Sequence, residues 1–176
     1  MVELRTKRLL LRRAEETDVD GLHAVFREPR AMRYWSELPY TDPAQTLAFI
    51  RGMQGIHDRS PLEFMVEFEG RAIGKTGIFD GQEIGYILHP DTWGQGLATE
   101  AISAVCQHAF DTVGLTKITA DVDPRNDVSV HLLCKLGFLE TGRAEKTLQL
   151  GEEWCDSIYY ALSPGNFRAA TTALTN

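Results

Sequence analysis

The hydrophobic pattern of this chain changes its period twice, and this order of periods limits the folds that it can adopt. Phe64, Val66 and Phe68 alternate with polar or opposite-face residues, as is typical of half-buried β-strands. Glu69-Gly70 and Asp80-Gly81 are turn sequences that divide this region into three parts. We therefore expect an antiparallel meander in the middle of the chain. Its strands lie around residues 64–68, 72–79 and 83–88.

Helical spacing precedes this meander. Thr17 and Asp20 fit a capping box, and an apolar stripe at helical spacing follows them. Asp42-Pro43 with Gln45 marks a second helix start, because an acidic N-cap, a proline at the first helical position and a capping glutamine occur together. This second helix is expected to run to about His57.

Helical spacing returns after the meander. Apolar residues from Ala98 to Ala109 predict a long helix, and residues 117–122 predict a strand. Since the helix separates this strand from residues 83–88, the two strands are expected to be parallel neighbours in a right-handed crossover. The other expected elements are a first strand within residues 7–13, a short helix over about 127–136 that ends at Gly137, strands at 139–150 and 154–162, and a loose tail at 164–176.

These elements predict an α/β (α+β) fold with a mixed, mostly antiparallel sheet and one parallel pair. The chain has 176 residues, near the size of one domain. It contains no internal repeat, low-complexity stretch or linker. We therefore expect a single domain over residues 1–163, followed by the tail at 164–176.

Composition narrows the range of partners. The formal net charge is −7, which disfavours nucleic acid and is compatible with a cationic substrate such as an amine. No apolar run approaches the roughly 20 residues that cross a bilayer, and the start lacks the apolar stretch of a secretion signal. We expect a cytoplasmic protein, a monomer or homodimer, without nucleic-acid or membrane partners. Cys106, Cys134 and Cys155 fit reduced, mostly buried thiols better than a disulfide framework.

A glycine-containing loop directly precedes the long helix. It reads Trp93-Gly94-Gln95-Gly96-Leu97-Ala98-Thr99. Glycine lets the backbone approach a ligand closely and adopt positive φ. The first helical turn adds unpaired N–H groups and a partial positive charge. The segment is therefore either a phosphate-binding loop or a flexible connection with a glycine at the helix start.

Two common nucleotide motifs fit this loop poorly. The Gly-Lys-Ser/Thr ending of a P-loop is absent, and Thr99 stands where a dinucleotide fingerprint has its third glycine. Asp121 and Asp123 do lie roughly where a ribose-binding acid falls. A dinucleotide-dependent oxidoreductase thus remains an alternative, although one crossover gives only half of a dinucleotide fold.

Several segments together resemble the GNAT superfamily of acetyltransferases, and more closely its RimJ/RimL-like branch of ribosomal-protein N-terminal acetyltransferases. The matching segments are Thr6-x-Arg8-Leu9-x-Leu11-Arg12, Glu83-Ile84-Gly85-Tyr86, the loop with Glu100-Ala101, Asn126-x-x-Ser129, and Lys135-Leu136-Gly137-Phe138. The resemblance implies the GNAT fold, with helices on both faces of the sheet. Many superfamily members have Arg or Gln at the position of Trp93, whereas the RimJ/RimL-like branch often has an aromatic residue there.

The resemblance also implies acetyl-coenzyme A as co-substrate, with no metal. The main-chain amides from Gly94 to Thr99 would hold its diphosphate. The backbone of Ile87 and Leu88 would receive the pantetheine arm and the acetyl group through a gap between the parallel strands. Asn126 would reach the coenzyme, although asparagine is also a common N-cap. The residues implied at the coenzyme are Ile87, Leu88, Trp93, Gly94, Gln95, Gly96, Leu97, Ala98, Thr99 and Asn126.

Glu83 and Ser129 are the candidate catalytic residues. Strand alternation places Glu83, Gly85 and Ile87 on one face, so the Glu83 carboxylate could accept the amine's proton. Its alternative role is an exposed acid beside a turn. Many GNAT enzymes have an acidic tyrosine seven residues after the helix asparagine, but this chain has Leu133 there. Ser129 is the expected substitute, unless its hydroxyl only bonds helix backbone.

Aromatic residues suggest where the acceptor binds. Tyr34 and Trp35 could form a wall of the acceptor site or cover an edge of the core. Tyr86 falls on the face opposite Glu83 and is expected in the core. The histidines show no metal-ligand spacing, and Cys106 and Cys134 lie on apolar helical stretches and are expected to be buried.

The sequence therefore predicts an N-acetyltransferase in which a primary amine attacks acetyl-coenzyme A directly. The acceptor would be a protein N-terminus or a small amine such as a polyamine or an antibiotic. An acetyl-coenzyme A sensor that has lost catalysis is the second hypothesis, since the usual tyrosine is missing.

Overall fold

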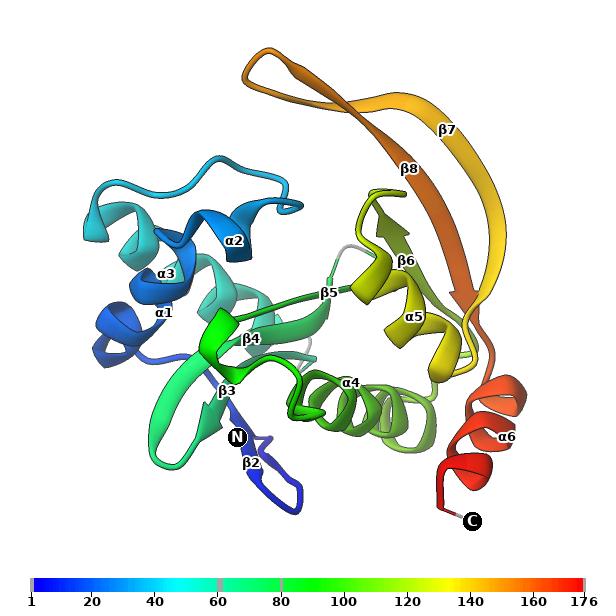
Figure 1. The fold of residues 1–176 in the computed structure, drawn as a ribbon. Coiled ribbons are helices and arrows are strands. Elements are labelled where there is room, and N and C mark those ends of the chain that lie inside the picture. Colours follow the sequence, from blue (N-terminus) through cyan, green and yellow to red (C-terminus); the bar gives the residue numbers. More distant parts are fainter. Residues whose placement is uncertain (1, 60–61, 80, 176) are drawn as a thin grey trace.

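Eight strands form one open sheet in the order β1-β2-β3-β4-β5-β6-β8-β7 (Figure 1). The computed structural model describes residues 2–59, 62–79 and 81–175. The strands are β1 (Leu4–Arg5), β2 (Leu9–Arg12), β3 (Glu63–Phe68), β4 (Arg71–Phe79), β5 (Glu83–Leu88), β6 (Ile118–Val122), β7 (Leu139–Leu150) and β8 (Glu153–Leu162). Within the described residues only β5 and β6 run parallel, so the expected mixed sheet is confirmed.

Helices cover both faces of this sheet. They are α1 (Val19–Phe26), α2 (Pro29–Met32), α3 (Pro43–Arg59), α4 (Leu97–His108), α5 (Asp127–Lys135) and α6 (Pro164–Thr175). Met65 and Ile87 belong to the core under α1 and α3. Phe64 and Leu88, their neighbours in sequence, belong to the larger core that includes Ile102 of α4. Successive strand residues point to opposite faces, which is why one sheet supports two cores.

The parallel pair is the narrowest connection in the sheet. β5 and β6 share one registered position, Glu83 opposite Thr119, whereas β4 and β5 share six from Gly74–Leu88 to Phe79–Glu83. β5 and β6 therefore diverge after this one pair, and the sheet is open between them beyond Glu83. On the far side of this opening, β7 and β8 form a long curved hairpin that rises above the rest of the sheet (Figure 1).

The turn and cap predictions have mixed outcomes. At the first hairpin turn, Glu69 and Gly70 both have positive φ, +50° and +74°, as a tight hairpin turn requires. Asp80 of the second turn lies outside the described residues. The main-chain N–H of Ala44 donates to the Asp42 side chain over 2.8 Å, which confirms the start of α3. The short helix α2 was not expected.

The capping box expected from Thr17 and Asp20 is wrong. Glu15 and Asp18 form the box instead, around a short 3-10 turn (Glu16–Asp18) that leads into α1, and the Asp18 side chain accepts a hydrogen bond from the main-chain N–H of Glu15 over 2.8 Å. Asp18 is buried, and its charge is compensated by the guanidinium of Arg12 at 2.7 Å. This ion pair joins the turn to the neighbouring strand β2, a contact that sequence spacing does not reveal.

The loose tail expected after residue 163 is also wrong. Residues 164–175 form α6, and Phe167 is buried with its ring 5.8 Å from that of Phe110. Gly137, the glycine that ends α5, has a φ of +91° and lies against the main chain of Asn166. The end of the chain thus packs on the core because one aromatic side chain anchors an otherwise weakly apolar helix.

Candidate active site

The loop before α4 has the backbone expected of it. Gly94 and Gly96 have φ of +73° and +77°, in the left-handed region that favours glycine. A Cβ atom added to Gly94 would meet nothing within 4 Å, and at Gly96 it would meet only the Arg8 guanidinium at 3.6 Å. Gly96 is also the N-cap of α4 and has no side chain to cap the first N–H groups. The loop therefore presents open backbone donors at the positive end of a helix.

Glu100, in the first turn of α4, fastens this loop to the N-terminal strands. Its carboxylate accepts hydrogen bonds from the Thr6 hydroxyl at 2.6 Å, the Arg8 main chain at 2.8 Å and the Arg8 side chain at 2.7 Å. The same guanidinium donates to the main-chain carbonyl of Gln95 over 2.8 Å. Both the first strand and the loop resemble the GNAT superfamily in sequence. These bonds give a structural reason why the two segments occur together.

A cavity of about 710 Å³ lies in front of the loop. It is large enough for a cofactor-sized ligand. Of the residues expected at the coenzyme, those that line it are Ile87, Leu88, Trp93, Gly94, Gly96, Leu97, Ala98, Thr99 and Asn126. Gln95 is not among its lining residues, and its side chain instead donates to the main chain of Asp91.

A second cavity, of about 450 Å³, is lined by the first part of β5, from Glu83 to Tyr86, whereas the larger cavity is lined by Tyr86, Ile87 and Leu88. Its lining includes Glu83, the candidate base, and the carboxylates Glu63, Asp121, Asp123 and Asp156. The size is that of a small-molecule site, and its acidic lining favours a cationic guest. The two cavities share five lining residues, namely Tyr34, Trp35, Tyr86, Asn126 and Ser129.

Asn126 and Ser129 meet where the cavities adjoin. The Asn126 side chain caps α5 by accepting a hydrogen bond from the Ser129 main-chain N–H over 3.2 Å. Asn126 therefore caps α5 and also lines both cavities. The Ser129 hydroxyl accepts a hydrogen bond from the Tyr86 hydroxyl over 3.1 Å. Leu133, the position at which the GNAT resemblance would place a tyrosine, is fully buried.

Tyr86 is the main residue that sequence reasoning missed. It was expected in the core, and it does pack against the α4 core, but it also lines both cavities. Burial raises the pKa of Tyr86 to about 12, against the opposing effect of its bond to Ser129. Strand alternation correctly predicted that Tyr86 lies on the face of the sheet that packs against α4. No sequence signal showed that Ser129, on a later helix, would lie beside the Tyr86 hydroxyl.

Asp121 and Asp123 are two further acids of the smaller cavity. Partial desolvation by the surrounding walls raises the pKa of Asp121, opposed by a hydrogen bond with Ser157. Asp121 and Asp123 line the smaller cavity and not the cavity at the glycine loop. They are therefore not placed to bind the ribose of a nucleotide held at that loop.

A buried ion pair lies in the wall of the smaller cavity. Lys75 and Glu63 are 3% and 2% exposed and form a salt bridge. The Lys75 ammonium also lies 5.7, 5.8 and 5.6 Å from the ring centroids of Trp35, Phe49 and Phe79. This aromatic surround stabilises a cation that is withdrawn from water.

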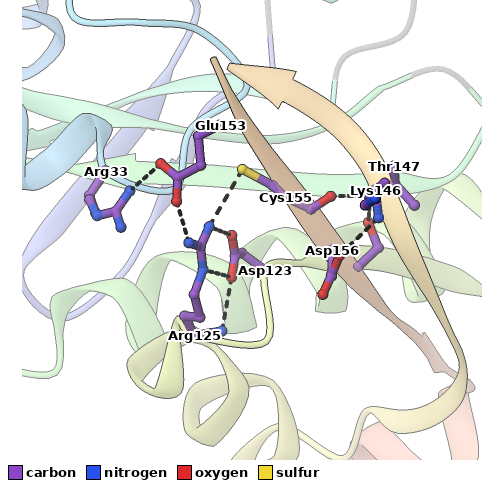
Figure 2. A network of polar contacts seen from close by, with 9 residues as sticks. Arg33, Asp123, Arg125, Lys146, Thr147, Glu153, Cys155 and Asp156 are labelled. Carbon is purple, nitrogen blue, oxygen red and sulfur yellow. Dashed lines mark hydrogen bonds and ion pairs between the residues drawn. The ribbon is translucent and has the colours of Figure 1, made fainter. Parts of the chain in front are cut away.

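A network of ion pairs joins three segments beside the smaller cavity (Figure 2). Glu153 at the start of β8 pairs with Arg33 at 3.2 Å and with Arg125. Arg125 also donates to Asp123 over 2.9 Å, and its hydrogen bonds hold the pKa of Asp123 below its usual value. Both guanidiniums lie near the Tyr34 ring, at 5.3 and 5.9 Å. The network thereby holds the Tyr34 loop against the hairpin.

Other sequence expectations can be placed in the same way. Cys106 is buried, but Cys134 is exposed. Leu133 on α5 and Leu136 directly after it are fully buried, and Cys134, the residue after Leu133, turns away from that side. In the described part of the chain, no group of His, Cys, Asp and Glu could hold a metal ion. None of the helices described is long and apolar enough to span a membrane.

Comparison with known proteins identifies relatives of this arrangement. The family model "Acetyltransferase (GNAT) domain" matches residues 8–139. Spermidine N(1)-acetyltransferase of Escherichia coli K12 is 32% identical over 145 residues, which cover 75% of this chain and 73% of that protein.

Solved structures match nearly the whole chain. A GNAT-family acetyltransferase from Bacillus anthracis superposes with a TM-score of 0.82 at 27% identity, covering 92% of this chain and 98% of that one. RimL, a ribosomal L7/L12 α-N-protein acetyltransferase solved in complex with coenzyme A, gives a TM-score of 0.80 at 19% identity, with the same two coverages. At that identity the second match shows the fold alone.

Proposed function

Because the chain belongs to the GNAT family of acetyltransferases, we propose that it binds acetyl-coenzyme A in the larger cavity and acetylates a small cationic amine held in the smaller one. One observation carries this proposal: a cavity at a glycine loop adjoins a carboxylate-lined cavity, and the two share Tyr86 and Ser129. Donor and acceptor can therefore meet without any acyl group on the enzyme.

The residues of the larger cavity fit a coenzyme diphosphate. Open backbone at Gly94 and Gly96 and the first turn of α4 provide N–H donors, which bind phosphate without a lysine. Ile87 and Leu88 line the same cavity beside the opening of the sheet. This arrangement supports a thioester that reaches from the loop toward β5.

Transfer to an amine has three chemical requirements. The ammonium group must lose a proton, the thioester oxygen must be stabilised as it becomes negative, and the thiolate must be protonated as it leaves. We assign proton removal to Glu83, which lines the acceptor cavity, directly or through water. We assign the second role to main-chain amides near Leu88 and the third to the Ser129 hydroxyl.

The carboxylates that line the smaller cavity support a cationic amine as the acceptor. The carboxylates of this cavity outnumber its lysine, and that lysine is already paired with Glu63, so a polyamine or similar diamine is favoured electrostatically. The 32% identity to spermidine N(1)-acetyltransferase supports the same class. N-terminal acetylation of a protein, as in the RimJ/RimL-like branch, is the second candidate, because RimL shares the fold.

An acceptor panel tests this proposal. Thiol release from acetyl-coenzyme A is measured with spermidine, other diamines, monoamines and peptides with free N-termini. We expect the highest kcat/KM with a diamine or polyamine. Peptides as the preferred substrates would replace this class with the second candidate, and no transfer to any amine would contradict the proposed function.

Glu83→Gln tests the assigned base. We expect turnover to fall by about 100-fold, in the usual range for loss of a general base, while affinity for coenzyme A changes little. Glu152→Gln, an exposed acid in the β7–β8 turn, is the matched control. Unchanged turnover in Glu83→Gln would remove Glu83 from the mechanism.

A further inference from the structure

The hydroxyl groups of Tyr86 and Ser129 form a polar pair between the two cavities. Tyr86 reaches this point from β5 and Ser129 from the first turn of α5, and their oxygens are 3.1 Å apart. Both residues line both cavities. If donor and acceptor occupy these cavities, the reacting thioester must lie near the boundary that the pair forms.

We propose that Tyr86 is a positioning residue, which orients the Ser129 hydroxyl so that Ser129 donates its hydrogen to the departing sulfur. This inference rests on the proposed function and adds a residue that the GNAT resemblance did not supply. Tyr86 takes no proton and makes no bond to the substrate in this role.

The direction of the hydrogen bond gives the reason. A serine hydroxyl has one hydrogen and two acceptor lone pairs, and its hydrogen rotates to suit its partners. When Tyr86 donates to Ser129, it occupies one of those lone pairs, so the serine hydrogen must point elsewhere. Asn126 already accepts from the Ser129 main-chain N–H. The serine hydrogen is thereby left for an acceptor in the cavities.

The protonation of Tyr86 supports a constant donor role. A phenol whose pKa is raised to about 12 by burial stays protonated throughout the neutral range. It can therefore donate to Ser129 at every step. Leu133 is fully buried and apolar, so no phenol comes from the helix position used in many relatives. In this chain the phenol comes from β5 instead.

The proposed step balances as follows. The bound ammonium group first releases one proton to solvent water through Glu83. The nitrogen of the neutral amine then forms a bond to the carbonyl carbon and loses a second proton to Glu83. The carbon–sulfur bond breaks, its electron pair goes to sulfur, and the Ser129 proton passes to sulfur. Charge that develops on the serine oxygen is stabilised by the Tyr86 hydrogen bond. Water carries the proton released at Glu83 back to Ser129, so no further reagent is consumed.

A double-mutant cycle tests this inference. The variants are Tyr86→Phe, Ser129→Ala and the double variant, with Tyr160→Phe as the control because Tyr160 is also buried but lines neither cavity. For each protein we would measure kcat, KM for acetyl-coenzyme A and affinity for coenzyme A. Slow hydrolysis of acetyl-coenzyme A without an amine is measured in parallel, since it too requires departure of the thiolate.

We expect Tyr86→Phe to lower kcat about tenfold, the range for one hydrogen bond to a group that gains charge. KM and coenzyme affinity should stay within about twofold, and the double variant should match Ser129→Ala, because Tyr86 acts through Ser129. Wild-type kcat in Tyr86→Phe, or losses that multiply in the double variant, would overturn the inference. If no amine is acetylated but hydrolysis shows the same non-additive pattern, the proposed acceptor fails while the role of Tyr86 stands.

Discussion

The indole N–H of Trp93 donates a hydrogen bond to the main-chain carbonyl of Leu88 over 2.9 Å. This bond links the glycine loop directly to the end of β5, the strand that lies beside both cavities. Trp93 is 51% exposed, so its ring contributes little to the core. Its hydrogen bond instead positions the loop. Trp93, which the GNAT resemblance places at the coenzyme, thus holds the loop to β5 and also lines the larger cavity.

Trp93→Phe should weaken coenzyme binding while leaving turnover at saturation nearly unchanged. Loss of one neutral hydrogen bond is worth about 1 kcal/mol, so the Kd for coenzyme A should rise about fivefold. Trp154→Phe is the matched control, because Trp154 is equally exposed but lies on the hairpin away from the loop. Equal effects of the two substitutions on binding would contradict a role for the Trp93 bond.

Gly96→Val should abolish coenzyme binding and also reduce stability. The added side chain has room within the protein, so the stability loss arises from the φ of +77°, which β-branched residues rarely adopt. The cost should be about 1–2 kcal/mol, and the side chain would occupy the space in which a diphosphate meets the backbone.

Gly151→Val separates these two effects. Gly151 also has positive φ, +59°, and has nothing within 4 Å of an added Cβ, but it lies in the β7–β8 turn. We expect a similar loss of stability with normal coenzyme binding, measured by chemical unfolding and calorimetry. Normal binding by a folded Gly96→Val variant would count against the loop as the coenzyme site.

The Glu100 attachment should make the loop sensitive to acid. Partial burial raises the pKa of Glu100, but the hydrogen bonds from Thr6 and Arg8 outweigh it and the net pKa is lowered. A carboxylate with a lowered folded-state pKa stabilises the fold above its unfolded pKa of about 4.3, and this contribution is lost as pH falls through the folded value.

Unfolding free energies of wild type and Glu100→Gln test this at two pH values. We expect a difference of about 1–2 kcal/mol at pH 7, which shrinks as the pH is lowered below the unfolded-state pKa of about 4.3. Glu152→Gln should show a difference near zero at both. If the difference in unfolding free energy between wild type and Glu100→Gln grew as the pH was lowered, it would contradict the lowered pKa of Glu100.

The buried Lys75–Glu63 pair should matter most when only one partner is removed. Lys75→Met leaves a carboxylate that is 2% exposed without its cation, and such a loss costs about 3–5 kcal/mol. Adding Glu63→Gln should recover most of this, because the remaining uncompensated charge is then gone. Chemical unfolding of both variants measures the effect; a Lys75→Met protein with wild-type stability would contradict it.

Local patterns predicted most of the fold. The meander, α3, α4 and the parallel position of β6 follow from period and turn residues, which act over a few neighbouring residues. Errors occurred where distant contacts decide the structure. Glu15 and Asp18 replaced Thr17 and Asp20 in the capping box, with Asp18 held by Arg12 on another element, and α6 formed because Phe167 meets Phe110.

The candidate site divides in the same way. Ile87, Leu88 and the run Trp93–Thr99, which lie close together in the chain, were identified from sequence, and all of them except Gln95 line one cavity. The pairing of Tyr86 with Ser129, the Lys75–Glu63 bridge and the Arg33–Glu153 contact join residues far apart in the chain. Their side-chain types alone could not show that they meet.

The single registered position between β5 and β6 divides the sheet into two halves, β1–β5 and β6–β8. Few main-chain hydrogen bonds cross this seam, so side chains largely fix how the halves are oriented. A thioester and an amine bound on either side of Tyr86 and Ser129 would contact both halves at once. Bound substrates would then link the two halves of the sheet. The enzyme with both substrates bound should therefore unfold at a higher temperature than the empty enzyme, and its two halves should move less relative to each other.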